Sequence, residues 1–249
     1  MSDLGDLRSD EFAALVAGAR PFAVLVPIGS IEPHGPHLPL ATDALISQGA
    51  CARAVGLLDA GGVDARVSAA VPFGVTECAA GFPGAVTVSP AALTAYLRAV
   101  VDGLLGAGAR HVCLVNNHLE PAHDAAVRAA IAGLAPAQAS VACPLTRRWA
   151  RTLSDEFKSG ACHAGRYETA IVMALAPALV DEASRSALPA VPISLSEQLR
   201  AGVTTFAAMG MDRAYGGAPA EATAAEGEGS LDRLAQMIAT EVLEALARS

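Results

Sequence analysis

Short, almost continuously apolar runs alternate along the chain with longer segments in which apolar residues recur at helical spacing. The short runs, which are typical of strands buried on both faces, cover residues 21–28, 67–73, 111–115 and 141–145. The helical pattern covers residues 10–19, 43–60, 90–105, 121–134, 166–175 and 229–247. This alternation predicts an α/β fold with a mostly parallel sheet covered by helices on both faces, which is a three-layer sandwich.

No linker or repeat interrupts this alternation, so we expect a single domain over residues 1–249. The helix at 90–105 has the clearest start, because Ser89 is a good N-cap and proline suits the first helical position. Residues 79–84 and 202–228 are rich in Gly, Ala and Thr with weak periodicity, and they predict long functional loops.

The composition excludes several classes of protein. Hydrophobic residues make up 53% of the chain and charged residues 17%, which excludes an acidic disordered protein. The longest apolar run, residues 170–180, contains Pro177 and is well short of the ~20 residues of a membrane span. A net charge of −8 with a single lysine argues against a nucleic-acid partner.

Cysteine usage and the N-terminal residues favour a cytoplasmic location. The five cysteines are odd in number and lack CxxC spacing, so we expect reduced thiols rather than a disulfide framework. Residues 1–12 contain three aspartates and have neither the basic nor the apolar region of an export signal.

A Pro- and Gly-rich loop, residues 29–43, directly follows the first apolar run. It contains Glu32, His34, His37 and Asp43. Prolines restrict the backbone, so such a loop can hold side chains rigidly. Imidazole together with carboxylates is a ligand set for Zn²⁺ or Mn²⁺, and four such residues in one loop favour a metal site over a solvated turn.

Two further segments carry ligand-type residues. His118 and Glu120 follow the run at 111–115, near the carboxyl end of a predicted strand, where sites form in open α/β sheets. The alternative is a helix-capping asparagine with an exposed His118. In the segment 162–169, His163 is interpreted as catalytic, whereas Glu168 is assigned a structural role at the helix start.

Other polar residues are weaker candidates. We interpret His123 as part of a solvated helix face, the alternative being a supporting contact to the site three residues after Glu120, and we interpret His111 as structural. His37 and Cys162 are candidate substrate or supporting contacts, and Glu77 lies in a loop that can close over the site. Arg147 and Arg148 either meet an anionic substrate or, more commonly for such pairs, are simply solvated. A nucleotide-binding oxidoreductase is excluded because no GxGxxG opens a helix after a strand.

Five motifs, taken in order, resemble the creatininase family. They are GSIEPHGPHLPLATD at 29–43, GFPGAVTVS at 81–89, VNNHLEP at 115–121, HAGRYETA at 163–170 and ATAAEGE at 222–228. The resemblance spans roughly residues 22–240. It implies a creatininase-like α/β fold and a metal-dependent amidohydrolase that cleaves non-peptide, often cyclic, C–N amide bonds. Deformylation, peptide trimming and a catalytically silent metal-binding assembly subunit are the alternatives.

The resemblance also implies a binuclear centre and the roles of its residues. One metal ion would be held by Glu32, Asp43 and His118, and the other by His34, Asp43 and Glu120, with Asp43 bridging. Zn²⁺, Mn²⁺ and Fe²⁺ all suit such mixed ligands. His163 matches the family's catalytic histidine, and Glu120 is expected to be catalytic as well as a metal ligand. The family further implies a homo-oligomer, commonly a hexamer, and a small-molecule amide substrate.

Departures from the family pattern argue against creatinine as the substrate. Pro33, Asn117 and Pro121 replace the usual residues, and Cys162 stands where creatinine-hydrolysing members carry Glu. Those members also bring tryptophans over the substrate, whereas Trp149 is the only tryptophan here. Glu120 distinguishes the chain from the mycofactocin-peptidase branch, which tends to have Gly at that position.

Overall fold

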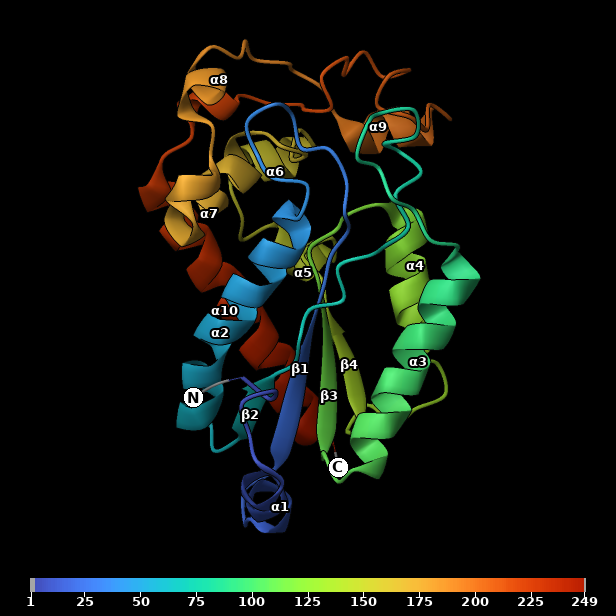
Figure 1. The fold of residues 1–249 in the computed structure, drawn as a ribbon, viewed down its shortest axis with the longest axis vertical. Helices are drawn as coiled ribbons and strands as arrows, with labels where there is room; N and C mark the ends of the chain where they lie inside the picture. Colours follow the sequence, from blue (N-terminus) through green and yellow to red (C-terminus); the bar gives the residue numbers. More distant parts are fainter. Residues whose placement is uncertain (1–2, 249) are drawn as a thin grey trace.

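A parallel four-stranded sheet forms the centre of the protein in the computed structural model, which describes residues 3–248 (Figure 1). The strands are β1 (Phe22–Ile28), β2 (Asp64–Val67), β3 (His111–Asn116) and β4 (Ala139–Ala142), in the order β2-β1-β3-β4. Ile28 at the end of β1 pairs with Asn116 at the end of β3. The carboxyl ends of the two central strands therefore lie side by side.

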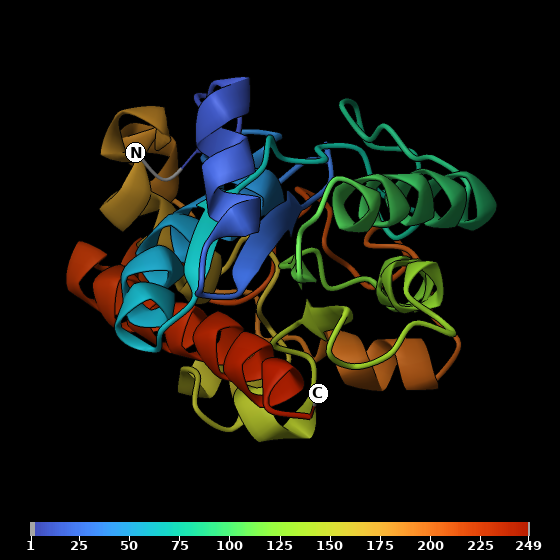
Figure 2. The same cartoon turned by 90° about the horizontal axis from the view of Figure 1, so that it is seen from below.

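Helices cover both faces of the sheet, which confirms the predicted three-layer α/β fold. One face carries α2 (Thr42–Ala60), α7 (Arg166–Leu175) and α10 (Ala224–Leu246), and the other carries α3 (Pro90–Gly106) and α4 (Pro121–Ala130) (Figures 1 and 2). Successive residues of β1 alternate between the two cores: Ala23 and Leu25 face α2 and α10, whereas Val24 and Val26 face α3 and α4. This alternation follows from the two-residue period of a strand.

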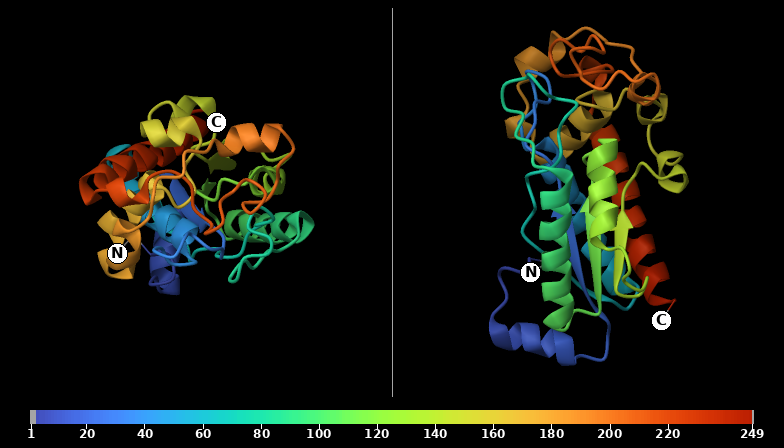
Figure 3. Two further views of the ribbon diagram at one scale, coloured as in Figure 1. Left: turned by 90° about the horizontal axis from the view of Figure 1, so that it is seen from above. Right: turned by 90° about the vertical axis from the view of Figure 1, so that its right-hand side faces the viewer.

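Smaller helices surround this framework. The N-terminal α1 (Ser9–Ala17) lies at the amino ends of the strands (Figure 3). The opposite end carries the long loops and the short helices α5 (Arg147–Ala150), α6 (Asp155–Ser159), α8 (Glu182–Ser186) and α9 (Leu195–Arg200), with 3-10 turns η1 (Pro177–Leu179) and η2 (Pro219–Glu221). The sequence pattern did not predict these short elements, because each is too short to show a period. Within residues 3–248, no helix is long and apolar enough to cross a membrane.

Several predicted boundaries were wrong, and three of them have a clear local cause. The second strand ends at Val67, where it was predicted to begin; beyond it only Val71 bridges to β1, and Pro72 has no N–H with which to extend a ladder. The fourth strand lies at 139–142 rather than 141–145 and ends before Pro144. The last helix begins at Ala224, because Thr223 and Glu226 form a capping box ahead of its two glycines.

Gly227 allows α10 to pack directly on α7. A Cβ at this position would lie 1.9 Å from the carbonyl oxygen of Ala170, a backbone atom that cannot move aside cheaply. We expect Gly227→Ala to lower the free energy of unfolding by about 1–3 kcal/mol through overpacking. Gly229→Ala in the same helix is the matched control, because nothing lies within 4 Å of its added Cβ.

Urea unfolding of both variants tests this packing. The control is expected to be more stable than the native chain by about 0.5–1 kcal/mol, the usual gain of alanine over glycine in a helix. Equal midpoints for the two variants would show that the contact between α10 and α7 does not depend on Gly227.

Candidate metal centre

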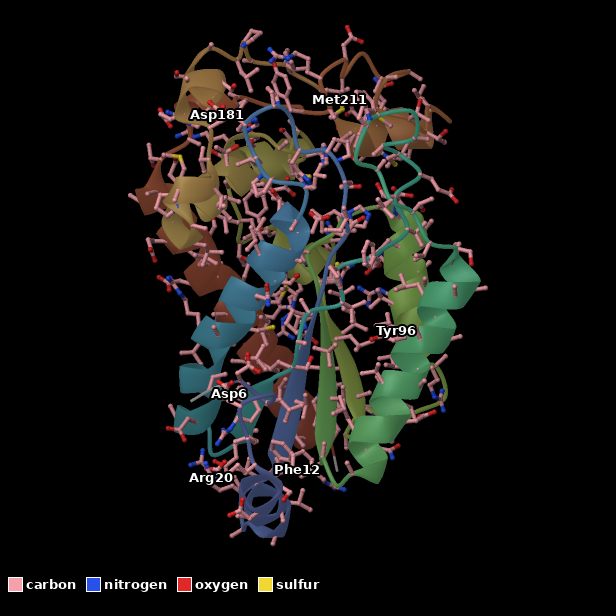
Figure 4. All side chains as sticks on the ribbon, viewed as in Figure 1. Asp6, Phe12, Arg20, Tyr96, Asp181 and Met211 are labelled. Atoms are coloured by element: carbon pink, nitrogen blue, oxygen red, sulfur yellow. The ribbon has the colours of Figure 1, made fainter. Side chains whose placement is uncertain are left out.

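The site lies at the carboxyl ends of the two central strands, β1 and β3, where the loops that follow them begin. The chain leaves β1 at Gly29 and enters α2 at Thr42, and it leaves β3 at Asn116 and enters α4 at Pro121. Gly29 is required at the first exit, since a Cβ there would lie 2.4 Å from the backbone nitrogen of Ala44. The upper loops that hold Asp181 and Met211 in Figure 4 lie above these strand ends. The segment before α7 completes the enclosure.

Histidines and carboxylates from all three segments meet in a buried cluster. The Asp43 carboxylate is central: Oδ1 lies 3.2 Å from His34 Nε2, and Oδ2 lies 3.1 Å from His118 Nδ1. His118 Nδ1 is also 3.3 Å from Glu32 Oε1, and His34 Nε2 is 3.6 Å from Glu168 Oε2. The structure thus brings together the carboxylates of the first loop, the histidines of two loops and Glu168 of α7.

Each histidine is oriented by a backbone carbonyl behind it. His34 Nδ1 donates to the carbonyl of Glu32 at 3.0 Å, and His118 Nε2 donates to that of Val75 at 2.7 Å. His163 Nε2 donates to the carbonyl of Pro33 at 3.0 Å. When such a ring is neutral, its lone pair lies on the other nitrogen, which in all three rings faces the cluster.

The buried carboxylates of the cluster need positive charge nearby to compensate them. Glu32, Asp43 and Glu168 are all buried, and no arginine or lysine of the described residues forms an ion pair with them. Burial by itself lowers the pKa of His34, yet the carboxylates of Asp43, Glu168 and Glu32 raise it to about 10. Burial and the Asp43 carboxylate raise the pKa of Glu168 to about 8. Buried carboxylates are costly unless a cation compensates them, so the donor set fits divalent metal ions.

The distances bring Glu168 into the cluster beside the ligands that the resemblance implied. Possible ligand atoms of His34, Asp43 and Glu168 lie within 4.8 Å of one another, and so do those of Glu32, His118 and Glu120. Glu168 thus lies beside His34 and Asp43, and Glu120 lies beside Glu32 and His118; the ligand set implied by the resemblance stays a prediction. The structural role proposed for Glu168 does hold in part, because its carboxylate also accepts from the backbone N–H of Ala164 at 2.7 Å.

Glu120 is held from behind by the loop that follows β2. Its two oxygens accept from the backbone N–H groups of Glu77 and Cys78, each at 3.0 Å. Burial raises the pKa of Glu120. The Glu77 side chain is exposed, so this residue contributes its backbone rather than its carboxylate.

His37 and Cys162 lie beside the cluster. His37 Nε2 lies 2.9 Å from the hydroxyl of Thr169, and burial lowers the pKa of His37 to about 4. This neutral ring joins the first loop to α7. Burial raises the pKa of the Cys162 thiol, which lines the cavity described below as a neutral group.

Two residues of the site were missed by the sequence patterns, and a third, His123, was placed on the wrong surface. The Thr76 hydroxyl donates to Glu32, and the Phe206 ring stacks on His163 with centroids 4.2 Å apart. His123 was predicted on a solvated helix face, but it is fully buried with its ring 4.6 Å from that of His118. Its spacing from Glu120, three residues along a helix, was the available signal. Phe206 lies in a loop without periodicity.

A cavity of about 600 Å³ opens onto the cluster. At its inner end lie Asp43, His118, Glu120, His163 and Glu168. Its walls are mainly apolar and include Leu119, Phe157, Leu195, Leu199 and Phe206. Volumes of this size accommodate small organic ligands.

A family model described as creatinine amidohydrolase, named creatininase, matches residues 5–242. The chain belongs to the creatininase family. Members of this family are hydrolases that act on C–N bonds. The family membership therefore supports a hydrolase acting on C–N bonds for this chain.

Curated relatives and solved structures agree with this membership. The chain is 31% identical over 231 residues to the mycofactocin precursor peptide peptidase of Mycolicibacterium smegmatis, covering 91% of this chain and 85% of the relative. It is 30% identical over 122 residues, 47% of this chain and 45% of the relative, to the creatinine amidohydrolase of Pseudomonas putida. A solved creatinine amidohydrolase (creatininase) shares the fold with a TM-score of 0.71 at 22% identity, covering 96% of this chain and 95% of that one.

The comparisons also bear on the prediction, made from Glu120, that the chain differs from the mycofactocin-peptidase branch of the family. Glu120 pointed away from the mycofactocin peptidases, yet the alignment with these peptidases extends over most of the chain. A single position thus does not separate this creatininase-family chain from them. A solved relative described as "Creatininase Mn" has the same fold, with a TM-score of 0.73 at 22% identity over 98% of both chains.

His123 positions the metal-facing His118 through one peptide group. His123 Nδ1 accepts from the N–H of Val75 at 3.2 Å, and the carbonyl of Val75 accepts from His118 at 2.7 Å. We expect His123→Leu to weaken metal binding by about 10–100-fold, as is typical when a group behind a metal ligand is lost. His123→Gln offers an oxygen acceptor to Val75 and is expected to restore most of the affinity. Metal titration of both variants checks this, and native affinity in His123→Leu would contradict it.

Proposed function

We propose that this protein is a hydrolase of amide C–N bonds that uses two divalent metal ions. The observation that carries the proposal is the position of Asp43, whose two carboxylate oxygens face different histidines, His34 and His118. A carboxylate in this position can bridge two ions. A solved relative, a mutant creatininase described as "Zn-Zn type", supports such a centre.

The residues divide into two ligand sets. Glu32, Asp43 and His118 would hold one ion, and His34, Asp43 and Glu168 would hold the other. Mixed oxygen and nitrogen donors suit Zn²⁺, Mn²⁺ or Fe²⁺. When bound, such ions polarise a carbonyl group and lower the pKa of water.

Glu120 and His163 carry out the proton transfers in this proposal. Glu120 takes a proton from the attacking water, because its carboxylate reaches the cavity and its two backbone donors fix its position. Burial and the neighbouring His34 lower the pKa of His163 to about 4, so its ring is neutral at pH 7 with a lone pair on Nδ1. His163 relays the proton through Nδ1 to the leaving nitrogen as the C–N bond breaks.

The substrate is larger than creatinine in this proposal. Trp149 donates its indole N–H to Glu241 and does not line the cavity, so tryptophan does not cover the substrate. The apolar cavity of about 600 Å³ has room for an extended amide. Trimming of a peptide is the second candidate, supported by the alignment with mycofactocin precursor peptide peptidases over 91% of the chain.

Metal content per chain is the first test. Protein purified without tag or chelator is expected to hold about two divalent ions per chain by elemental analysis. The loaded protein is then assayed against cyclic amides, formamides and short peptides. A metal content near zero after reconstitution with Zn²⁺ and Mn²⁺ would overturn the proposal and favour a silent assembly subunit.

A further inference from the structure

The outer part of the cavity is cationic, although the chain carries a net charge of −8. Four basic residues from three segments line it: Arg147, Arg151, Lys158 and Arg200. The acidic residues that line the cavity all belong to the buried cluster at its inner end. The cavity thus combines an inner end that binds cations, an apolar middle and an outer end that attracts anions.

Arg147 and Arg151 are unusual because nothing neutralises them. They are exposed, lie one helical turn apart at α5, and repel each other as like charges at this spacing. Within residues 3–248, neither guanidinium has an ion-pair or hydrogen-bond partner. Arg148, which lies between them in the sequence, does have partners. It pairs with Glu244 at 2.6 Å and its guanidinium lies over the Trp149 ring. Arg148 does not line the cavity.

The partners of the two other basic residues do not neutralise Arg147 and Arg151. Lys158 pairs with the fully exposed Asp155 at 2.7 Å, and Arg200 contacts only the hydroxyl of Ser196, at 3.3 Å. Two arginines without a partner, together with Lys158 and Arg200, therefore line the cavity.

We propose that Arg147 and Arg151 form an anion subsite that binds a carboxylate of the substrate. The inference rests on the proposed function, because it takes the inner cluster as the place where the amide bond is cleaved. The substrate class is then an acylated amino acid or a short peptide with a free C-terminus. Its amide lies at the cluster, its apolar part lies against Phe157 and Leu199, and its carboxylate lies at the two arginines. Guanidinium groups suit this role because their planar donors match a carboxylate.

Binding of a matched pair of compounds tests the subsite. N-benzoylglycine and N-benzoylglycinamide differ only in whether the far end is charged. Isothermal titration is done with native protein, with the Arg147→Gln/Arg151→Gln variant and with Arg148→Gln as control. We expect native protein and the control to bind the acid at least about fivefold more tightly than the amide, since each exposed ion pair contributes modestly. The double variant is expected to lose this preference while its affinity for the amide stays unchanged.

Metal ions can also attract a carboxylate, so each titration is repeated on metal-free protein. A preference that depends on the arginines in both forms supports the subsite, whether or not any amide is hydrolysed, and thus separates this inference from the proposed function. An unchanged preference in the double variant, an equal loss in Arg148→Gln, or no binding of the acid at millimolar concentration would overturn it. Tighter binding of the matched phosphonate would replace the carboxylate assignment with a phosphorylated ligand.

Discussion

Asp43→Asn is expected to remove both metal ions and to lower turnover by about a thousandfold or more. Asparagine keeps the shape of the side chain but loses its charge and one of the two oxygens that face His34 and His118. Because both proposed ligand sets share this carboxylate, neither set is complete without it. Elemental analysis of the purified variant and its rate on an amide substrate measure the two effects.

Asp124→Asn is the control, because Asp124 pairs with Arg128 on α4 and lies outside the cluster. Glu168→Gln and Glu120→Gln then show which of these two carboxylates completes the ligand set of His34 and Asp43. Glu168→Gln is expected to retain about one ion per chain, whereas Glu120→Gln is expected to retain both and lose rate. The reverse result would support the ligand set implied by the sequence resemblance and contradict the one proposed from the distances. Two ions in Asp43→Asn would exclude a bridging role for Asp43.

The sheet was predictable because its central strands are buried on both faces. Residues 22–28 and 111–116 are buried throughout, so their apolar runs stand out without any periodicity. The edge strands are four residues each and only partly buried, so their apolar pattern is weak, and Pro144 follows shortly after the end of β4. The start of α10 carried a capping signal at Thr223 and Glu226, but the two glycines that follow obscured it.

The site was predictable where ligand-type residues cluster in sequence. Glu32, His34 and Asp43 lie in one loop, and the pairing of β1 with β3 explains why His118 joins them. The division of the carboxylates between two ligand sets depends on distances across loops, so spacing alone could not decide between Glu120 and Glu168. Phe206 reaches His163 from an irregular loop, and no local pattern predicts such a contact.

His163→Gln is expected to keep the metal content of the native protein and to lower the rate by about 10²–10⁴-fold, the usual contribution of a positioned proton-transfer group. His163 Nδ1 lies 3.6 Å from Glu32, while its other nitrogen is held by the Pro33 carbonyl. Glutamine can preserve a hydrogen bond to Pro33 but cannot take up and release a proton near neutral pH. Rate and metal content are measured on the same preparation.

His111→Gln is the matched control, because it replaces a buried histidine that bonds Ala137 and Ser140 at the opposite end of β3. Its effect is expected on the urea midpoint rather than on the rate of the folded protein. A combined loss of metal in His163→Gln would instead make His163 a ligand, an arrangement that its distance to Glu32 and His34 also permits geometrically. Full activity with full metal content would exclude both roles and leave Glu120 as the only side chain proposed to transfer a proton.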